Sequence, residues 1–266
     1  MSTTSVTIPV ETVKAAGVDL KIIRGGSGEP VLILHDEMGN PGWLKFHQGM
    51  AKSHSVIMPQ HPGFGESERL DWVMNMRDLA GWYLEALDDL GLEQVNLIGS
   101  SLGGWLAAEM ATMCPQQFKK LVLVGAAGVK PPEGEIFDIF QVLAREYLEF
   151  SLYDPANTPE FPAICPDEPS PELLDAWDSA REGACVLSWR PYMHYPNLPH
   201  LLSRLKRLPT LIIWGREDPI VPLSAGELYH SSIPGSKLVV IDKCGHRPEV
   251  EHPDRMAEIV SEFLST

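Results

Sequence analysis

The stretch NLIGSSLGGW, residues 96–105, carries the strongest fold signal in the chain. Its first half is apolar enough for a buried strand, and its second half opens a helical pattern. Between them lies G-x-S-x-G, the pattern of a nucleophile held on a tight strand-to-helix turn. Backbones approach closely two places before and after that nucleophile, so small residues are needed there, and Gly99 and Gly103 supply them around Ser101. Centring the pattern on Ser100 would place bulky side chains at both positions, so Ser101 is the predicted nucleophile.

Strand and helix patterns alternate on both sides of this turn. Apolar runs typical of buried parallel strands occupy residues 31–35, 54–60, 94–100, 118–127, 209–215 and 236–242. Amphipathic patterns predict helices over residues 77–93, 102–115, 222–235 and 253–266, with Gly91 as a C-terminal cap of the first. Two further strands are expected near the start, over residues 6–13 and 18–26. The alternation predicts an α/β fold, a mostly parallel sheet with helices on both faces.

The alternation stops over residues 131–205. Residues 136–155 predict one amphipathic helix, and residues 173–189 predict another. Between them prolines crowd the chain, which excludes a long regular helix or a central strand. We therefore expect residues 1–130 and 206–266 to form an α/β core, with 131–205 inserted as a helical cap.

Composition limits the partners of this protein. The 266 residues carry 21 basic and 36 acidic side chains, a formal charge of −15, which argues against nucleic acid or an anionic membrane as partner. No apolar run approaches the roughly 20 residues of a membrane helix, and the start lacks a signal-peptide pattern, so a cytoplasmic protein is expected. The four cysteines form no CxxC pair, so no zinc or thioredoxin-like motif is expected; their even number permits disulfides, but we expect free thiols. Neither a metal nor an organic cofactor is expected. A homo-oligomer stays open.

A serine nucleophile needs a base and a group that orients the base. Asp218 stands in the loop after one late strand and His246 in the loop after the next, where open α/β sheets bind ligands. The order Ser101, Asp218, His246 is the order that hydrolases of this design use. The sequence offers rivals, namely Glu217 and Asp242 as acids and His252 as base. An independent loop makes the better orienter, and His252 opens the last helix, so Asp218 and His246 are preferred.

Three further motifs join the nucleophile turn: HPGFGES at 61–67, WGREDPIVP at 214–222 and CGHRPEVEHP at 244–253. Together they resemble the α/β-hydrolase superfamily, in its serine-nucleophile branch, over about residues 28–129 and 206–264. The chain is similar to capped small carboxylesterases and lactonases and to meta-cleavage-product hydrolases, which cleave carbon–carbon bonds. The resemblance implies a cap over a catalytic triad of Ser101, Asp218 and His246.

The sequence departs from that family pattern at three places. Relatives usually have His-Gly after the third strand, where this chain has His35-Asp36. Many have Asp before PGFG, where this chain has His61. The carbon–carbon hydrolases typically have Trp after the catalytic histidine, where this chain has Arg247. The last difference sets the chain apart from that subfamily.

The turn after residue 35 is expected to supply part of an oxyanion hole. Its two donors would be the backbone N–H groups of Leu102 and Glu37. The carboxylate of Glu37 is expected to face solvent or a partner such as Arg247 or His61. Asp36 needs room near the backbone where relatives have glycine. Carboxylates pointing inward would repel anionic substrates, so neutral substrates are expected.

Aromatic and apolar side chains of the expected cap predict an apolar pocket above the serine. They are Phe137, Phe140, Tyr147, Trp177, Trp189, Tyr192 and Met193. The residues taken as pocket candidates are His35, Asp36, Trp189, Tyr192 and Arg247. Arg190 or His194 could bind a substrate carboxylate, although an exposed loop explains them equally well.

The main hypothesis is a serine hydrolase that cleaves a small or medium, neutral carboxylic ester or lactone through an acyl-enzyme on Ser101. The alternative is hydrolysis of a carbon–carbon bond in a vinylogous diketone, so the partner is a small ester, lactone or ketone. A third hypothesis is a protein of the same fold that binds a ligand without turning it over.

Overall fold

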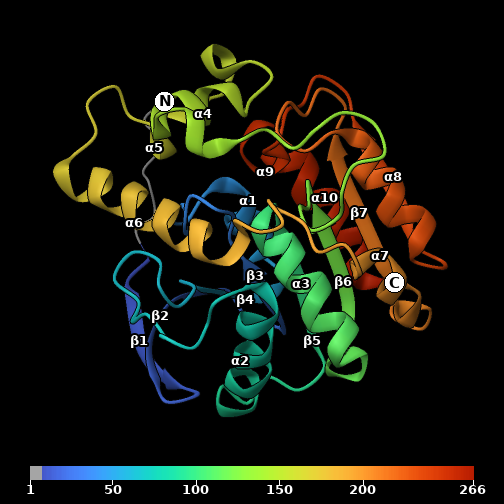
Figure 1. The fold of residues 1–266 in the computed structure, drawn as a ribbon. Coiled ribbons are helices and arrows are strands. Elements are labelled where there is room, and N and C mark those ends of the chain that lie inside the picture. Colours follow the sequence, from blue (N-terminus) through green and yellow to red (C-terminus); the bar gives the residue numbers. More distant parts are fainter. Residues whose placement is uncertain (1–7) are drawn as a thin grey trace.

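The computed structural model describes residues 8–266, which contain one eight-stranded sheet in the order β1-β2-β4-β3-β5-β6-β7-β8 (Figure 1). Its strands are β1 Val10–Ala15, β2 Val18–Gly25, β3 Glu29–Leu34, β4 His54–Pro59, β5 Val95–Ser100, β6 Phe118–Val124, β7 Thr210–Gly215 and β8 Lys237–Ile241. β1 and β2 pair in antiparallel fashion, and β2 is also antiparallel to β4. The six strands from β4 to β8 are parallel. The expected mostly parallel sheet is confirmed.

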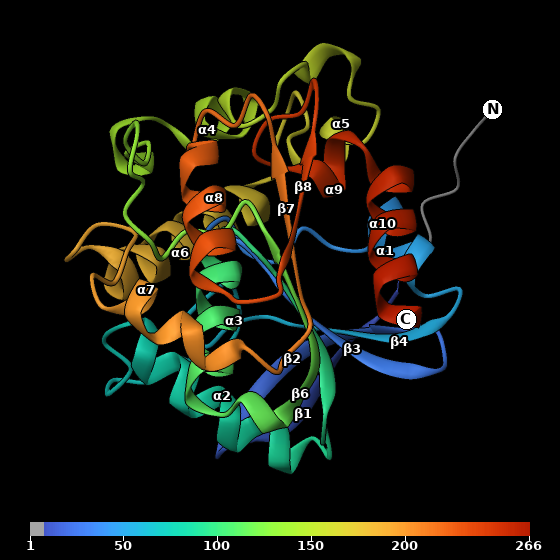
Figure 2. The ribbon, with the colours of Figure 1, turned by 90° about the vertical axis from the view of Figure 1, so that its right-hand side faces the viewer.

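Helices cover both faces of this sheet (Figure 2). They are α1 Lys45–Met50 and α10 Pro253–Ser265 on one face, and α2 Met76–Asp89, α3 Leu102–Met113 and α8 Leu223–Ser232 on the other. Along β3, Val31 and Ile33 join the core under α1 and α10, while Leu32 and Leu34 join the larger core under α2 and α3. Side chains of a strand alternate between faces, so a strand buried on both sides is apolar throughout.

The segment between β6 and β7 consists of helices and turns. Its elements are η2 Ile139–Gln141, α4 Ala144–Phe150, η3 Pro155–Asn157, α5 Phe161–Ile164, α6 Pro171–Ser188, α7 Leu198–Leu201 and η4 Leu202–Leu205. Figure 1 shows α4, α5 and α6 on the side of the sheet to which the parallel strands point. This is the edge where the loops after β5, β7 and β8 gather.

Two expected elements differ from the structure. The helix expected over residues 136–155 is only α4, because the Asp138 carboxylate accepts from Phe140 N and fixes a separate turn first. The Glu146 carboxylate then accepts from Leu143 N at 3.0 Å and starts α4. The strand expected over 6–13 begins at Val10, and residues 6 and 7 lie outside the described part. The prediction of Gly91 as helix terminator is confirmed by its φ of +65° just after α2.

Two smaller expectations concern membranes and thiols. Within residues 8–266 we find no helix with the length and apolar character needed to cross a membrane. The four cysteines are free, as predicted.

Candidate active site

Ser101 occupies the turn between β5 and α3 in a strained backbone conformation, with φ +49°. A Cβ at Gly99 would overlap the carbonyl of Gly103, and one at Gly103 would overlap the carbonyl of Leu34. Only glycine fits at these positions, which is the local reason why the chain turns there. The Ser101 side chain is buried, with 2% of the residue exposed.

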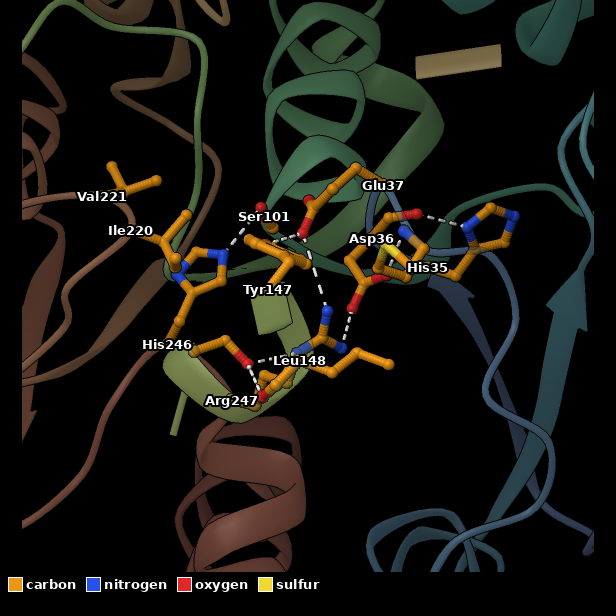
Figure 3. Close-up of polar contacts among 12 residues, drawn as sticks. His35, Asp36, Glu37, Ser101, Tyr147, Leu148, Ile220, Val221, His246 and Arg247 are labelled. Atoms are coloured by element: carbon orange, nitrogen blue, oxygen red, sulfur yellow. Dashed lines mark hydrogen bonds and ion pairs between the residues drawn. The ribbon is translucent and has the colours of Figure 1, made fainter. Parts of the chain in front are cut away.

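The structure brings Ser101, His246 and Asp218 into one hydrogen-bonded line, and Figure 3 shows the contact between Ser101 and His246. Ser101 Oγ lies 2.8 Å from His246 Nε2, and His246 Nδ1 lies 2.8 Å from Asp218 Oδ2. A carboxylate can only accept, so Nδ1 carries the ring proton and Nε2 is free to accept from the serine hydroxyl. Asp218 Oδ1 accepts from the backbone N–H groups of Ile220 and Val221, which fixes the carboxylate.

The protonation of His246 follows from these neighbours. Burial by itself lowers the pKa of His246, but the charge of Asp218, its hydrogen bond and the charge of Glu37 outweigh burial, so the pKa is raised. The ring is therefore prepared to take a proton.

The rival acids and the rival base are engaged elsewhere. Glu217 accepts from Cys244 N at 3.0 Å and holds the loop before the histidine. Asp242 forms an exposed ion pair with Arg216. His252 stands at the N-terminus of α10, with Nε2 2.9 Å from a backbone carbonyl. The structure thus favours Asp218 and His246 on geometry.

The loop after β3 and the start of α3 each contain one backbone amide without a protein acceptor among the described residues. Asp36 Oδ1 accepts from Met38 N at 2.7 Å, and the carbonyl of Asp36 accepts from Gly39 N. In the described chain, neither Glu37 N–H nor Leu102 N–H donates to a protein acceptor. Both amides remain available for the oxygen of a ligand.

Both acids of this loop face inward, and Arg247 is their partner (Figure 3). Arg247 Nη1 pairs with the Asp36 carboxylate, and Nη2 lies 3.6 Å from Glu37 Oε1. Arg247 Nε donates to Ser151 Oγ at 3.0 Å, and the hydroxyl of Tyr147 donates to Glu37 Oε1. We call Asp36, Glu37, Tyr147, Ser151 and Arg247 the charge cluster. Of the two orientations left open for Glu37, the partner orientation with Arg247 is found.

The guanidinium of Arg247 lies near several buried carboxyl groups, and the pKa values of these groups differ from one another. Burial raises the pKa of Asp36 to about 6 although Arg247 opposes it. Burial likewise raises the pKa of the neighbouring Glu249 to about 7. For Glu37, burial is outweighed by the charges of His246 and Arg247 and by the hydrogen bond from Tyr147, so its pKa is lowered. Glu37 is therefore ionised at neutral pH, while Asp36 and Glu249 titrate near it.

His35 and His61 support the loop from behind. His35 Nδ1 lies 2.7 Å from the carbonyl of Asp36, and His61 N donates to His35 Nε2 at 3.0 Å. The two rings stack with centroids 3.7 Å apart, and His61 Nδ1 lies 2.6 Å from the hydroxyl of Tyr83. Burial lowers the pKa of His35 to about 4, so the ring stays neutral.

A cavity of about 490 Å³ lies on the outer side of the charge cluster. Asp36 and Arg247 line it from the core, and Leu148, Ile164 and Trp177 line it from the segment between β6 and β7. Ser101 is not among its lining residues. The Asp36–Arg247 pair therefore separates the cavity from the buried serine.

Other predicted pocket residues lie elsewhere. Trp189 is 51% exposed and packs on Phe140, so the expectation that it lines the pocket is not met. The hydroxyl of Tyr192 donates to the Phe137 carbonyl and accepts from a backbone N–H, which ties this segment together. Arg190 and His194 line a separate cavity of about 280 Å³.

Sequence reasoning missed Ser151 and Glu249, and it placed Tyr147 only among apolar pocket residues. No local pattern marks them, because their partners lie far along the chain. No group of three or more His, Cys, Asp or Glu side chains within residues 8–266 is placed to hold a metal ion.

Comparison with known proteins agrees with this architecture. The model of the alpha/beta hydrolase family matches residues 31–259, and the chain belongs to that family. A 2-hydroxy-6-oxononadienedioate/2-hydroxy-6-oxononatrienedioate hydrolase of Burkholderia vietnamiensis is 30% identical over 98% of this chain and 97% of the relative. A 2-hydroxymuconate semialdehyde hydrolase of Pseudomonas sp. is 31% identical over 94% and 92%. The chain is thus a member of a hydrolase family, as expected.

Solved structures show the same fold. A meta-cleavage product hydrolase from Pseudomonas fluorescens superposes with a TM-score of 0.80 at 24% identity, over 97% of this chain and 98% of that one. A thermophilic esterase from Thermogutta terrifontis gives 0.71 at 26% identity, over 96% and 97%.

Proposed function

We propose that this protein hydrolyses a carbon–carbon bond next to a ketone in a vinylogous diketone, through an acyl-enzyme on Ser101. The observation that carries the chemistry is the hydrogen-bonded line from Ser101 through His246 to Asp218. The bond class is supported by the relatives, several of which are named as hydrolases of 2-hydroxy-6-oxo dienedioates or of 2-hydroxymuconate semialdehyde.

The mechanism uses the triad in the usual order. His246 takes the proton of Ser101, and Oγ attacks the ketone carbon. The N–H groups of Leu102 and Glu37 donate hydrogen bonds to the oxyanion. Losing one such donor typically raises the activation free energy by about 3 kcal/mol. The carbon–carbon bond then breaks, its electron pair moves into the conjugated carbonyl, and the leaving fragment takes the proton from His246. Water releases the acyl group.

Residues 131–205 act in this proposal as the cap. Support comes from α4, whose Tyr147 and Ser151 contact Glu37 and Arg247 beside the serine. The carbonyl of Ser151 also accepts from His246 N at 2.7 Å, so α4 is joined to the loop that carries the base. Side chains of α5 and α6 line the 490 Å³ cavity, which ends at the Asp36–Arg247 pair. In this proposal a substrate that enters there must pass that pair to reach Ser101.

Ester or lactone hydrolysis is the second candidate. It is favoured by Arg247, which stands where the carbon–carbon hydrolases typically have Trp. Inward acids also fit a neutral substrate better than an anionic dienoate. Both candidates use the same acyl-enzyme, so the substrate decides between them.

The test compares Ser101→Ala with Ser100→Ala. Ser101→Ala should lower turnover by at least about 10³-fold, and Ser100→Ala should leave it near the parent value. A ring-fission dienone is followed by loss of its colour, and a short p-nitrophenyl ester by release of nitrophenolate. Turnover of the dienone alone supports the proposal; turnover of the ester alone supports the second candidate.

Reaction of Ser101 with a fluorophosphonate checks the third hypothesis. A protein that only binds its ligand would leave Ser101 unlabelled and both substrates unchanged. Labelling of the parent and of Ser100→Ala, with none in Ser101→Ala, argues for catalysis.

A further inference from the structure

The carboxylate of Glu37 has one oxygen held and one oxygen free. Oε1 accepts from the Tyr147 hydroxyl and faces Arg247 Nη2 at 3.6 Å. Oε2 is buried and has no hydrogen-bond partner within the described residues. A buried carboxylate oxygen without a partner is costly, so its retention calls for a use.

The free oxygen lies beside the nucleophile. Figure 3 shows the Glu37 side chain reaching from the loop after β3 toward Ser101, with Arg247 on its other side. The charge of His246, which is hydrogen-bonded to Ser101, also favours the ionised form of Glu37. Glu37 is fully buried, so bulk water does not screen this contact.

An ionised carboxylate held in place beside a nucleophile is a proton acceptor. Arg247 and Tyr147 also balance its charge, which limits the repulsion of an oxyanion formed on the neighbouring amides. His246 remains the acceptor for the Ser101 proton, because it alone lies in line with Oγ at 2.8 Å through an atom free to accept.

We propose that Glu37 is a second general base, which activates the water that hydrolyses the acyl-enzyme. The inference rests on the acyl-enzyme of the proposed function. Water gives a proton to Glu37 Oε2, and its oxygen bonds to the acyl carbon. The bond between that carbon and Ser101 Oγ then breaks with its electron pair on Oγ, and Glu37 returns the proton to Oγ. The product acid leaves, and both residues regain their starting forms.

The experiment separates formation of the acyl-enzyme from its breakdown. The full-length protein is mixed rapidly with an excess of a short p-nitrophenyl ester, and the release of nitrophenolate is followed. The initial burst of nitrophenolate reports acylation, and the later linear slope reports deacylation. Glu37→Gln keeps the backbone N–H, the size and an oxygen that can accept from Tyr147. We expect a burst within about threefold of the parent and a slope lower by about 10²-fold or more. The intact-protein mass should show the acyl group accumulating.

Glu160→Gln is the matched control. One carboxylate oxygen of Glu160 accepts from Lys45 N at 2.8 Å and the other lacks a partner, as in Glu37, but Glu160 belongs to the start of α5. This variant should keep both the burst and the slope. Glu37→Asp, which retains a shorter carboxylate, should recover part of the slope that Glu37→Gln loses.

Each outcome decides the proposal. An equal fall of burst and slope in Glu37→Gln would mean that Glu37 only shapes the site, and an unchanged slope would remove its role altogether. Because the burst amplitude counts active sites, a poorly folded variant shows as a small burst with a parent-like rate per site. If Ser101 is not labelled by a fluorophosphonate, and neither the parent nor Glu37→Gln shows a burst or an acyl mass, the acyl-enzyme itself is refuted, which is the failure of the proposed function.

Discussion

Replacing Arg247 with methionine should destabilise the protein far more than replacing an exposed arginine. The change removes the guanidinium that Asp36 and Glu37 face, while the methionine side chain still fills most of the space. Arg247 and both carboxylates are almost fully buried, at 3%, 5% and 0% exposure. Water therefore cannot replace the lost charge.

Removing one partner of a buried ion pair typically lowers the free energy of unfolding by about 3–5 kcal/mol, because the remaining charge is buried without a partner. The lower end is expected, since Asp36 has a pKa of about 6 with Arg247 in place and can take up a proton when the arginine is lost. For a chain of this size, about 3 kcal/mol corresponds to a fall in Tm of roughly 6–12 °C. Below pH 5 Asp36, with its pKa of about 6, is already protonated in the parent, so the loss should shrink.

Urea unfolding at pH 7 and at pH 5 measures this loss. The control is Arg255→Met, because Arg255 pairs with Glu258 at 2.7 Å but both side chains are more than 60% exposed. An exposed pair contributes about 0.5 kcal/mol or less. The double variant Asp36→Asn/Arg247→Met should recover about 1–3 kcal/mol of the loss. A loss below about 1 kcal/mol at pH 7, or an equal loss at both pH values, would refute this reasoning.

Three other predictions follow from single positions. Asp218→Asn should lower kcat by about 10³–10⁴-fold, because an amide at Nδ1 no longer fixes the tautomer; near-parent kcat would contradict the assigned orienter. The folded pKa of Asp36, about 6, lies above its unfolded value of 3.8, so this group stabilises the fold below pH 3.8 and loses that effect as pH rises through 6. Asp36→Asn should flatten the fall in unfolding free energy between pH 5 and 7, and an unchanged slope in urea titrations would exclude Asp36 as its source. Gly103→Ala should inactivate and destabilise, since its Cβ overlaps backbone carbonyls, whereas Gly81→Ala in α2 meets nothing within 4 Å and should gain about 0.5–1 kcal/mol by thermal unfolding.

The fold was predictable where local chemistry decides it. The turn around Ser101 needs glycines at two fixed positions, and the sequence has them. Parallel strands buried on both faces are continuous apolar runs, which made β3 to β8 recognisable. The loops after β7 and β8 end at the same edge of the sheet, so the meeting of Asp218 with His246 also followed from topology.

The segment between β6 and β7 was less predictable because distant contacts organise it. Local patterning over residues 136–155 favoured one helix, but the backbone there divides into η2 and α4. Tyr147 reaches Glu37, which is 110 positions away, and Ser151 reaches Arg247, which is 96 positions away. The hydrophobic periodicity within the segment cannot predict contacts with residues so far away in the sequence.

The orientation of the two acids depended on a residue in the last tenth of the chain. Asp36 and Arg247 are 211 positions apart, and neither residue read alone fixes where its side chain points. The sequence left open whether the Glu37 carboxylate faces solvent or a partner such as Arg247, and it named no partner for Asp36. Their burial makes sense only when they are seen as a pair.

The departures at 36 and 247 therefore form one unit, together with Glu37, rather than independent changes. Asp36 and Glu37 without Arg247 would be buried charges without a partner, and Arg247 without them would be the same with opposite sign. Asp36→Gly alone introduces the glycine that is usual in relatives. Arg247 would then have Glu37 as its remaining acidic partner in this loop and would neutralise the charge of Glu37 more fully. Any gain in ester hydrolysis from that change would come from weaker repulsion of the oxyanion, since the acid at 37 stays beside Ser101. Arg247→Trp alone, by contrast, would leave two buried carboxylates without their cation.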